Sequence, residues 1–405
     1  MAYDLIRGIP QMMGLRTQFV HLWVCDQTEK SNDTFEDYGL FTQVEQLNKT
    51  ALKAHGLDKN GHLYKVNSFD FHRYEDIIKL ADDPDYNQAK FEGMLEIKGD
   101  SDHTKLIEML DALNDESQKI DDVFDTYFDS ENLVYWLAFQ ILTGNCDTQN
   151  RNCYLYSPLN SNTWYFLDWD NDGMLRKLEL SLTGFSDYAS WERGVSNYWG
   201  NVLFNRALRS KSFRSELDRA VKDLRSYMTE ARLSKMIKHY REVTESLVFA
   251  SPDIDHLPVT KDQYEQIAAA IPSEIEENYK SFRESFKKPM PFYIGVPQID
   301  NGKLRINWDA SYDFEARDIR YTVELARDYA ISDVVFKAED VLLPEVTCDA
   351  PDAGQYFVRV RANNSDGYTQ DAFDYYVTDD GKHYGMKCFY VQDGGKVVED
   401  TYEEG

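Results

Sequence analysis

The hydrophobic period of the chain changes at residues 287–291, and this change constrains the fold more than any other feature of the sequence. From about Tyr198 to Lys288, apolar residues recur at helical spacing. After the segment Lys-Lys-Pro-Met-Pro, apolar and polar residues alternate, as they do in strands with one buried face. One segment cannot satisfy both periods. We therefore expect a helical region followed by a separate all-β domain.

The expected all-β domain begins near residue 292. Its segments KLRINW, YTVELA and QYFVRVRA alternate, with Asn-Gly and Asp-Gly turns nearby. The Leu304-x-x-x-Trp308 strand and the strand GQYFVRVRANNSDG resemble those of a fibronectin type III domain over residues 292–378. Residues 379–405 are expected to form a hairpin or an acidic tail. The expected inward side chains are Trp308, Tyr321, Val323, Leu325, Tyr356, Val358 and Val360.

The first hundred residues are predicted to be mostly strand. Residues 19–24, 37–46 and 62–66 have strand-like patterns, and turn signals separate them. Helical spacing then appears over residues 100–114. The region up to about residue 100 is thus expected to supply a sheet.

A strongly apolar helix is predicted over residues 130–143, with Ser130 as its N-cap and Gly144 as its C-terminal stop. It has so few polar positions that we expect burial on most sides. Further along, Pro272 is expected to break a helix, and a capping box of Ser273 and Glu276 should start the next one.

Composition excludes several classes of function. The chain has 405 residues, and 44 Lys and Arg against 71 Asp and Glu give a net charge of −27. A nucleic-acid or anionic-membrane surface needs a basic face, so neither is expected as the main partner. No apolar run approaches the roughly 20 residues that span a bilayer. The N-terminus does not have the pattern of a signal peptide.

The cysteines do not indicate a disulfide framework. There are five, an odd number, and no pair has the C-x-x-C spacing of a zinc or redox site. We favour reduced, buried thiols, with a single Cys146–Cys153 bridge as the alternative.

The sharpest chemical feature is an acidic cluster, Asp168, Asp170 and Asp172, directly after a predicted strand. Three carboxylates this close repel one another unless a cation neutralises them. Oxygen ligands of this kind suit Mg²⁺ and Ca²⁺. The sequence therefore predicts a cation site in this loop.

A second polar loop, residues 145–152, follows the buried helix and contains Asp147 and Asn152. Two strands, residues 153–156 and 163–167, join this loop to the acidic cluster. The outer ends of a hairpin lie together, so Asp147 and Asn152 should lie near Asp170. An Asp, an Asn five residues later, a hairpin and a second Asp follow the order of the catalytic and metal loops of protein kinases.

Five segments together resemble the spore-coat CotH kinases, which are atypical secreted protein kinases. The resemblance covers about residues 1–290. Asp100, Cys153 and Asp168 depart from the family pattern, which has Asn, Tyr and Pro there. The segments are YGLFTQVEQ, GHLYK, MLEIKGD, NCDTQNRNCYLY and FLDWDND.

The resemblance implies an α+β fold with a two-lobed, atypical protein-kinase-like domain. A β-rich N-lobe would cover residues 1–125 and a helical C-lobe residues 126–290, ahead of the all-β fibronectin type III-like sandwich. The family normally has a longer N-terminal region with an Arg-Gly-Asn-x-x segment. We therefore expect a shortened N-lobe.

The resemblance further implies transfer of phosphate from ATP to Ser or Thr of a protein substrate. Asp147 would be the catalytic base or orient the acceptor hydroxyl. Asn152 and Asp170 would ligate Mg²⁺ or Mn²⁺, with Asp172 in support.

The resemblance also assigns nucleotide contacts and a location. Lys65 would contact the phosphates, Glu45 would form an ion pair with Lys65, and Lys98 is a further candidate for nucleotide binding. The family implies an extracellular location or one on a spore or cell surface, with cell-surface or coat proteins as partners.

Two other interpretations stay open. Residues 168–179 match the pattern of an EF-hand calcium loop, although a strand and not a helix is predicted to enter it. A Ca²⁺-stabilised adhesion module is therefore one alternative. The other is a pseudokinase that binds a surface partner without catalysis.

Overall fold

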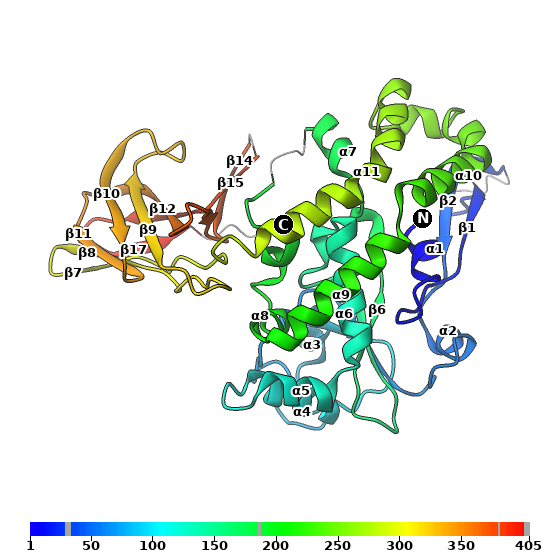
Figure 1. Cartoon of the computed structure of the whole chain (residues 1–405), viewed down its shortest axis with the longest axis horizontal. Helices are drawn as coiled ribbons and strands as arrows, with labels where there is room; N and C mark the ends of the chain where they lie inside the picture. Colours follow the sequence, from blue (N-terminus) through cyan, green and yellow to red (C-terminus); the bar gives the residue numbers. More distant parts are fainter. Residues whose placement is uncertain (29–33, 185–187, 380, 401–405) are drawn as a thin grey trace. The chain divides into compact units, whose positions relative to one another are not determined.

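The computed structural model describes residues 1–28, 34–184, 188–379 and 381–400 (Figure 1). The chain divides into two compact units. The first contains Met1–Ser186 and Asn201–Tyr279, and the second contains Asp187–Gly200 and Lys280–Gly405. The fold is a mixture of helices and strands up to about residue 285, followed by a β-rich region, as expected.

Among its described residues, the first unit contains six strands: β1 (Thr17–Val24), β2 (Glu36–Val44), β3 (His62–Val66), β4 (Leu95–Ile97), β5 (Cys153–Ser157) and β6 (Tyr165–Asp168). Its early helices are α1 (Ala2–Ile6), α2 (Lys49–Ala54), α3 (Gln88–Met94), α4 (Thr104–Asn114), α5 (Ile120–Tyr127) and α6 (Ser130–Thr143). The predicted strands near 19–24, 37–46 and 62–66 are confirmed. Short helices lie between the strands. Helix α2 separates β2 from β3 and helix α3 separates β3 from β4, and the side chains of Asn48 and Asn87 cap these helices.

Four of these strands form one antiparallel sheet in the order β4-β3-β5-β6. Strand β3 pairs along its whole length with β5, from His62 opposite Ser157 to Val66 opposite Cys153. This sheet combines strands from both sides of the predicted lobe boundary at residue 125. Strands β1 and β2 form a separate two-stranded hairpin.

The apolar helix predicted over 130–143 is α6, and its boundaries are confirmed. All of its residues except Ser130, Glu131 and Tyr135 are buried. Its N-cap is Asp129 and not Ser130, because the Asp129 carboxylate accepts a hydrogen bond from Asn132 N at 2.9 Å. Gly144 ends the helix in the left-handed conformation, as predicted.

Helices follow the acidic loop: α7 (Lys177–Leu182), α8 (Val202–Arg209), α9 (Lys211–Tyr227), α10 (Glu230–Val248) and α11 (Lys261–Ser285). Short 3₁₀ turns also occur in the chain: η1 (Cys146–Thr148), η2 (Asn171–Gly173), η3 (Gly194–Tyr198) and η4 (Asp253–His256). Helices α6 and α9 lie side by side in the first unit (Figure 1).

The prediction that Pro272 breaks a helix is wrong, because α11 continues through it. Contacts hold α11 on both sides of the proline. Arg241 of α10 is bound to Glu265 before it, and Asn278 after it donates a hydrogen bond to Leu142 O at 3.0 Å. Ile275 is also buried after the proline. These contacts outweigh the hydrogen bond that the proline cannot donate.

The second unit contains a β-rich region compatible with the expected fibronectin type III-like domain. One sheet has the order β11-β8-β7, and the other has the order β10-β9-β12-β16-β17, with β13 also on β12. The strands are β7 (Gln298–Asp300), β8 (Lys303–Asn307), β9 (Ile319–Ala326), β10 (Val334–Val341), β11 (Glu345–Asp349), β12 (Gly354–Asn364), β13 (Thr369–Asp371), β14 (Tyr375–Thr378), β15 (Gly381–Tyr384), β16 (Met386–Val391) and β17 (Val397–Glu399).

All seven side chains that were expected to point inward in this region are buried in one core. The Tyr356 hydroxyl donates a hydrogen bond to Asp352 O at 3.0 Å, four residues upstream. The described residues beyond 378 do more than form the predicted hairpin, and the last part of the predicted acidic tail, residues 401–405, lies outside the described residues. Strands β14 and β15 form a hairpin, and β16 pairs with β12 in the larger sheet.

Candidate functional site

The two polar loops of the first unit are brought together by the β5–β6 hairpin. Strand β5 begins where the 145–152 loop ends, and β6 ends where the acidic loop begins. Cys153 pairs with Asp168, so Asn152 and Trp169 leave the sheet at the same end. Trp169 packs edge-on against Tyr154 with ring centroids 5.5 Å apart. The predicted meeting of the two loops is therefore present.

Asp147 is held at the surface by its own loop. Its side chain is 55% exposed and accepts a hydrogen bond from Asn152 Nδ2 at 2.7 Å. Arg151 Nε lies 3.5 Å from the other carboxylate oxygen. An exposed carboxylate with a fixed orientation is available to an acceptor group from outside.

Asp170 lies near two other carboxylates and one lysine. Burial raises the pKa of Asp170 above its ordinary value, and the negative charges of Asp172 and Asp147 raise it further. The positive charge of Lys65 acts in the opposite direction. The predicted acidic residues and Lys65 are thus close enough to influence one carboxylate. Negative charge exceeds positive charge at this point.

The backbone is strained at both loops. Asn152 has φ of 60°, Asp170 has φ of 54° and Leu175 has φ of 55°, all in the left-handed region. The Asp170 amide donates a hydrogen bond to the Tyr3 hydroxyl at 3.2 Å, which helps to hold this conformation. Strain of this kind accumulates at functional sites, because the surrounding structure must hold it.

A buried polar layer lies beneath the two loops. Asp168 is 1% exposed and accepts a hydrogen bond from Gln140 Nε2 at 2.8 Å. Its other oxygen has no hydrogen-bond partner among the described residues. Burial raises the pKa of Asp168 to about 8, although the hydrogen bond from Gln140 lowers it. Burial thus disfavours the charged form of Asp168, and only Asp170 and Asp172 of the cluster face outward.

Lys65 lies on strand β3, and Lys98 lies directly after the neighbouring strand β4. Lys65 of β3 is directly opposite Glu96 of β4, and Lys98 follows β4 and forms an ion pair with Glu96. Lys65 itself forms no ion pair with any described residue. Of the two predicted nucleotide-binding lysines, Lys65 is thus the one with an uncommitted charge.

The expected ion pair between Glu45 and Lys65 is not present. Glu45 instead accepts hydrogen bonds from Arg16 Nε at 2.9 Å and from His55 Nε2 at 2.8 Å. The hydrogen bonds from Arg16 lower the pKa of Glu45 to about 2. Glu45 follows β2, which is not part of the β4-β3-β5-β6 sheet. Arg16 and His55 bind Glu45 in place of Lys65.

The calcium-loop alternative has the wrong surroundings. A strand, β6, leads into the loop, where an EF-hand has a helix. The first acidic position, Asp168, is buried and bound to Gln140. The last, Glu179, is bound by Arg176 at 2.8 and 3.0 Å. These contacts leave the ends of the pattern unsuited to Ca²⁺.

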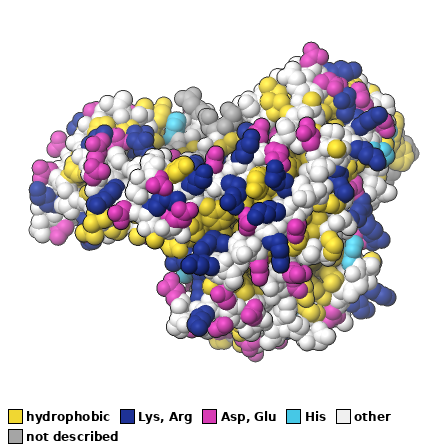
Figure 2. Space-filling view, viewed as in Figure 1, with side chains coloured by type: hydrophobic (Ala, Val, Ile, Leu, Met, Phe, Trp, Pro, Cys, Tyr) yellow, Lys and Arg dark blue, Asp and Glu magenta, His cyan; other side chains and the backbone are white. Residues whose placement is uncertain are grey.

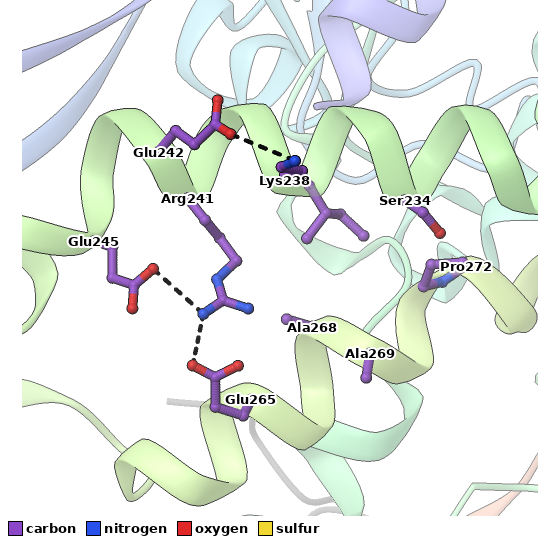
Figure 3. Close-up of a pocket in the computed structure, with 10 residues that line it drawn as sticks. Ser234, Lys238, Arg241, Glu242, Glu245, Glu265, Ala268, Ala269 and Pro272 are labelled. Carbon is purple, nitrogen blue, oxygen red and sulfur yellow. Dashed lines mark hydrogen bonds and ion pairs between the residues drawn. The ribbon is translucent and has the colours of Figure 1, made fainter.

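A pocket of about 510 Å³ lies between α10 and α11, away from the two loops in sequence. Figure 3 shows that Arg241 points into it between Glu245 and Glu265. The Arg241–Glu265 distance is 2.6 Å and the Arg241–Glu245 distance is 3.3 Å. None of the predicted site residues lines this pocket, and its inward cation is already neutralised.

The donors at the two loops fit a hard divalent cation in chemistry. Asn152, Asp170 and Asp172 offer amide and carboxylate oxygens. Burial and then the charges of Asp172 and Asp147 raise the pKa of Asp170, and a bound cation would offset those negative charges. No group of three or more His, Cys, Asp or Glu among the described residues forms a metal-binding cluster. A cation here would need ligands from outside the chain.

Sequence reasoning missed three residues near the site: Gln140, Tyr3 and Glu96. Gln140 looked like one more residue of a buried helix, and an amide among apolar residues was the available signal. Glu96 stands in the segment MLEIKGD, in which only Lys98 was given a role. Tyr3 carried no signal, because only the tertiary fold places it beside Asp170.

The family model described as CotH kinase protein matches residues 1–282. This chain therefore belongs to the CotH kinase family. No curated protein matches it. A solved structure described as "Twitchin kinase region from C.elegans (Fn31-NL-kin-CRD-Ig26)" is 19% identical over 24% of this chain, with a TM-score of 0.18. The match covers 20% of that protein, and a likeness this small carries no argument.

Across the described ranges, no helix combines the length and the apolar character that a membrane span requires.

Proposed function

We propose that this protein transfers the γ-phosphoryl group of ATP to Ser or Thr of a protein substrate. The observation that carries the proposal is the meeting of Asp147 and Asn152 with Asp170, under the opposing charge of Lys65. Phosphoryl transfer requires mainly positioning and the neutralisation of negative charge, and these residues are of the types that supply both. Membership of the CotH kinase family supports the same reaction.

In this proposal Asp147 accepts the proton of the acceptor hydroxyl. Its exposure leaves it accessible, and Asn152 and Arg151 fix its orientation. Asn152 uses its amide nitrogen on Asp147, so its carbonyl oxygen remains for a metal ion. Asp170 supplies the second protein ligand, with Asp172 in support.

Mg²⁺ or Mn²⁺ would neutralise the phosphate charge when bound. Mg²⁺ commonly uses one or two carboxylates, and substrate phosphates and water complete its coordination. A cage of three acidic residues is therefore not required. Lys65 is proposed to contact the phosphates. Glu96, opposite Lys65, is better placed than Glu45 to orient it.

Lys98 is the weaker candidate for nucleotide binding, because Glu96 already binds it. The protein partner, and a location outside the cell or on a spore or cell surface, follow from the family and belong to this proposal. The β-rich second unit is a candidate for binding surface or coat proteins.

Labelled ATP tests the reaction directly. The full chain is incubated with [γ-³²P]ATP, Mg²⁺ or Mn²⁺ and casein as a general acceptor, and phosphoamino acids are then identified. We expect label on Ser or Thr with wild type and none with Asp170→Ala. The matched control is Asp125→Ala, which removes an exposed acidic residue of α5. Equal labelling by wild type and Asp170→Ala would show that the assigned role is wrong.

A second candidate is a pseudokinase that binds nucleotide or a partner without transfer. The engagement of Glu45 by Arg16 and His55 favours it, because the expected partner of Lys65 is occupied elsewhere. Thermal unfolding with Mg·ATP separates the candidates from a non-binder. Nucleotide at 100 times its dissociation constant should stabilise the fold by about 2.7 kcal/mol. Stabilisation without label transfer would favour the pseudokinase, and stabilisation by Ca²⁺ alone would favour the adhesion module.

A further inference from the structure

Gln140, near the C-terminal end of α6, lies where three segments of the first unit meet. It is 1% exposed. Its amide nitrogen donates to Asp168 Oδ1 at 2.8 Å and lies 3.3 Å from Asn171 Oδ1. Its carbonyl oxygen accepts a hydrogen bond from Asn145 Nδ2 at 3.1 Å. One side chain thus contacts both polar loops from below.

The backbone of α6 supports the same connection. Asn145 N donates to Gln140 O at 3.1 Å, and Leu175 N donates to Thr143 O at 2.8 Å. The start of one loop and the end of the other are therefore bound to the last turn of one buried helix. That helix is fixed by extensive apolar burial, so it provides a rigid support.

The two loops also touch each other directly above Gln140. A Cβ atom placed on Gly173 would lie 2.6 Å from Asn145 Oδ1 and 3.8 Å from Asp147 Cβ. A real Cβ does not approach a heavy atom to 2.6 Å, so only glycine fits here without a shift of Asn145. The separation of the loops is therefore set within narrow limits.

We propose that Gln140 is a positioning residue that fixes the 145–152 loop relative to the 168–173 loop. The inference rests on the proposed function, because it matters for catalysis only if Asp147 and Asp170 act on one substrate. An amide suits this place because it donates to one loop and accepts from the other. A carboxylate would keep only the acceptor, and a methionine would keep neither.

The test compares Gln140→Met with Gln140→Glu and with a control on the same helix. Asn132 is the matched control, since it is a buried amide of α6 whose bonds go to Gln11 O and to the backbone of Phe166. These bonds reach neither loop. Asn132→Leu should therefore destabilise the fold without releasing the loops.

Two measurements are made on the full chain. Amide hydrogen exchange followed by mass spectrometry should show faster exchange in residues 145–152 and 168–175 together for Gln140→Met. It should show no such paired increase for Asn132→Leu. In the labelling assay, Gln140→Met should lower kcat at least tenfold and raise the Mn²⁺ concentration for half-maximal rate. Gln140→Glu should be intermediate.

The outcomes separate the two proposals. Unchanged exchange in both loops of Gln140→Met overturns the positioning role, whatever the activity. Faster paired exchange in a protein whose wild type transfers no label supports the positioning role and rejects the kinase. Faster paired exchange with an unchanged kcat and metal dependence shows that the loops need no alignment, and this overturns the catalytic part of the inference.

Discussion

Acidic side chains have different surroundings in the two polar loops of the first unit and in the large sheet of the β-rich region. Cations compensate the negative charge in the sheet more fully than in the loops. In that sheet Glu324 of β9 is 8% exposed and lies between Arg359 at 2.7 Å and Arg361 at 3.3 Å, with Lys337 at 3.8 Å. Burial raises the pKa of Glu324, but these cations outweigh that effect and lower it below its ordinary value. In the loops, burial raises the pKa of Asp170, the neighbouring carboxylates of Asp172 and Asp147 raise it further, and Lys65 is the opposing charge.

This difference in compensation separates acidic groups whose charge is paired within the fold from acidic groups that are available to bind a cation. A buried acid with several cations contributes to the folded state and leaves nothing for a substrate. A group of acids with too few cations destabilises the free protein, and a bound cation can reverse that cost. Figure 2 shows basic and acidic side chains interspersed over the visible face, so local pairing and not the net charge decides which case applies.

The largest expected effect is the loss of transfer in Asp147→Asn. Removal of a general base typically lowers the rate by about 10²–10⁴-fold. Stability should change little, because the side chain is 55% exposed and Asn keeps the shape. Initial rates of labelling and a thermal melt measure the two effects. Asp125→Asn should leave the rate unchanged. A folded Asp147→Asn with the wild-type rate would contradict the role.

Next in size is the loss of stability in Glu324→Ala. Glu324→Ala removes the carboxylate from cations that are partly exposed and loses the charged hydrogen bond from Arg359, which costs about 1.5–2 kcal/mol. Urea unfolding followed by tryptophan fluorescence measures it. Glu324→Gln retains a hydrogen-bond acceptor and should lose less. A change below about 0.5 kcal/mol in Glu324→Ala would mean that solvent screens this cluster as it does a surface pair.

Asp170→Asn should have a smaller effect of the opposite sign on stability. Because the pKa of Asp170 is raised in the folded protein, the folded state holds a proton that the unfolded chain has lost, and ionisation weakens the fold as pH rises. The neutral Asn should therefore raise the Tm of the metal-free protein at pH 7, by about 1–3 °C after allowance for solvent screening.

Melting curves at several pH values test this sign. The gain should disappear near pH 2, where wild-type Asp170 is protonated in both states. Mg²⁺ with ATP should also remove the gain by stabilising wild type alone. A lower Tm for Asp170→Asn at pH 7 would show that the carboxylate is already compensated.

The smallest expected effect is at Glu45, whose charge, like that of Glu324, is compensated by neighbouring side chains although it lies in the first unit. The hydrogen bonds from Arg16 lower its pKa to about 2, from an ordinary value of 4.5. Its contribution to stability is therefore present above pH 4.5 and is lost as pH falls toward 2. Glu45→Gln should melt below wild type at pH 7, and the two curves should converge as pH falls toward 2. A difference independent of pH would contradict this account.

The sequence predicted those features that depend on short segments. Helix α6, the β5–β6 hairpin and the meeting of the 145–152 loop with the acidic loop all depend on residues close in the chain, whose period and spacing can be read directly. The Asp129 cap and the continuous helix through Pro272 were missed. At the cap, a hydrogen bond decided between two neighbouring residues that both favour this position, and at Pro272 tertiary contacts outweighed a local preference against helix.

The pairing of strands that are distant in the chain could not be predicted from the sequence. Whether Glu45 or Glu96 would lie beside Lys65 depends on which strands share a sheet, and no local pattern reports that. The pairing of β16 with β12 extended the β-rich region past residue 378 for the same reason.

By itself, the sequence determined the types of residue available for chemistry and their order: an acid, an amide and a second acid around a hairpin. The tertiary structure alone decided that Asp168 is buried, that Glu45 is engaged elsewhere and that Gln140 joins the two loops. The physical reason is that burial and charge compensation are properties of a surrounding shell. Residues from distant parts of the chain form that shell only when the fold closes.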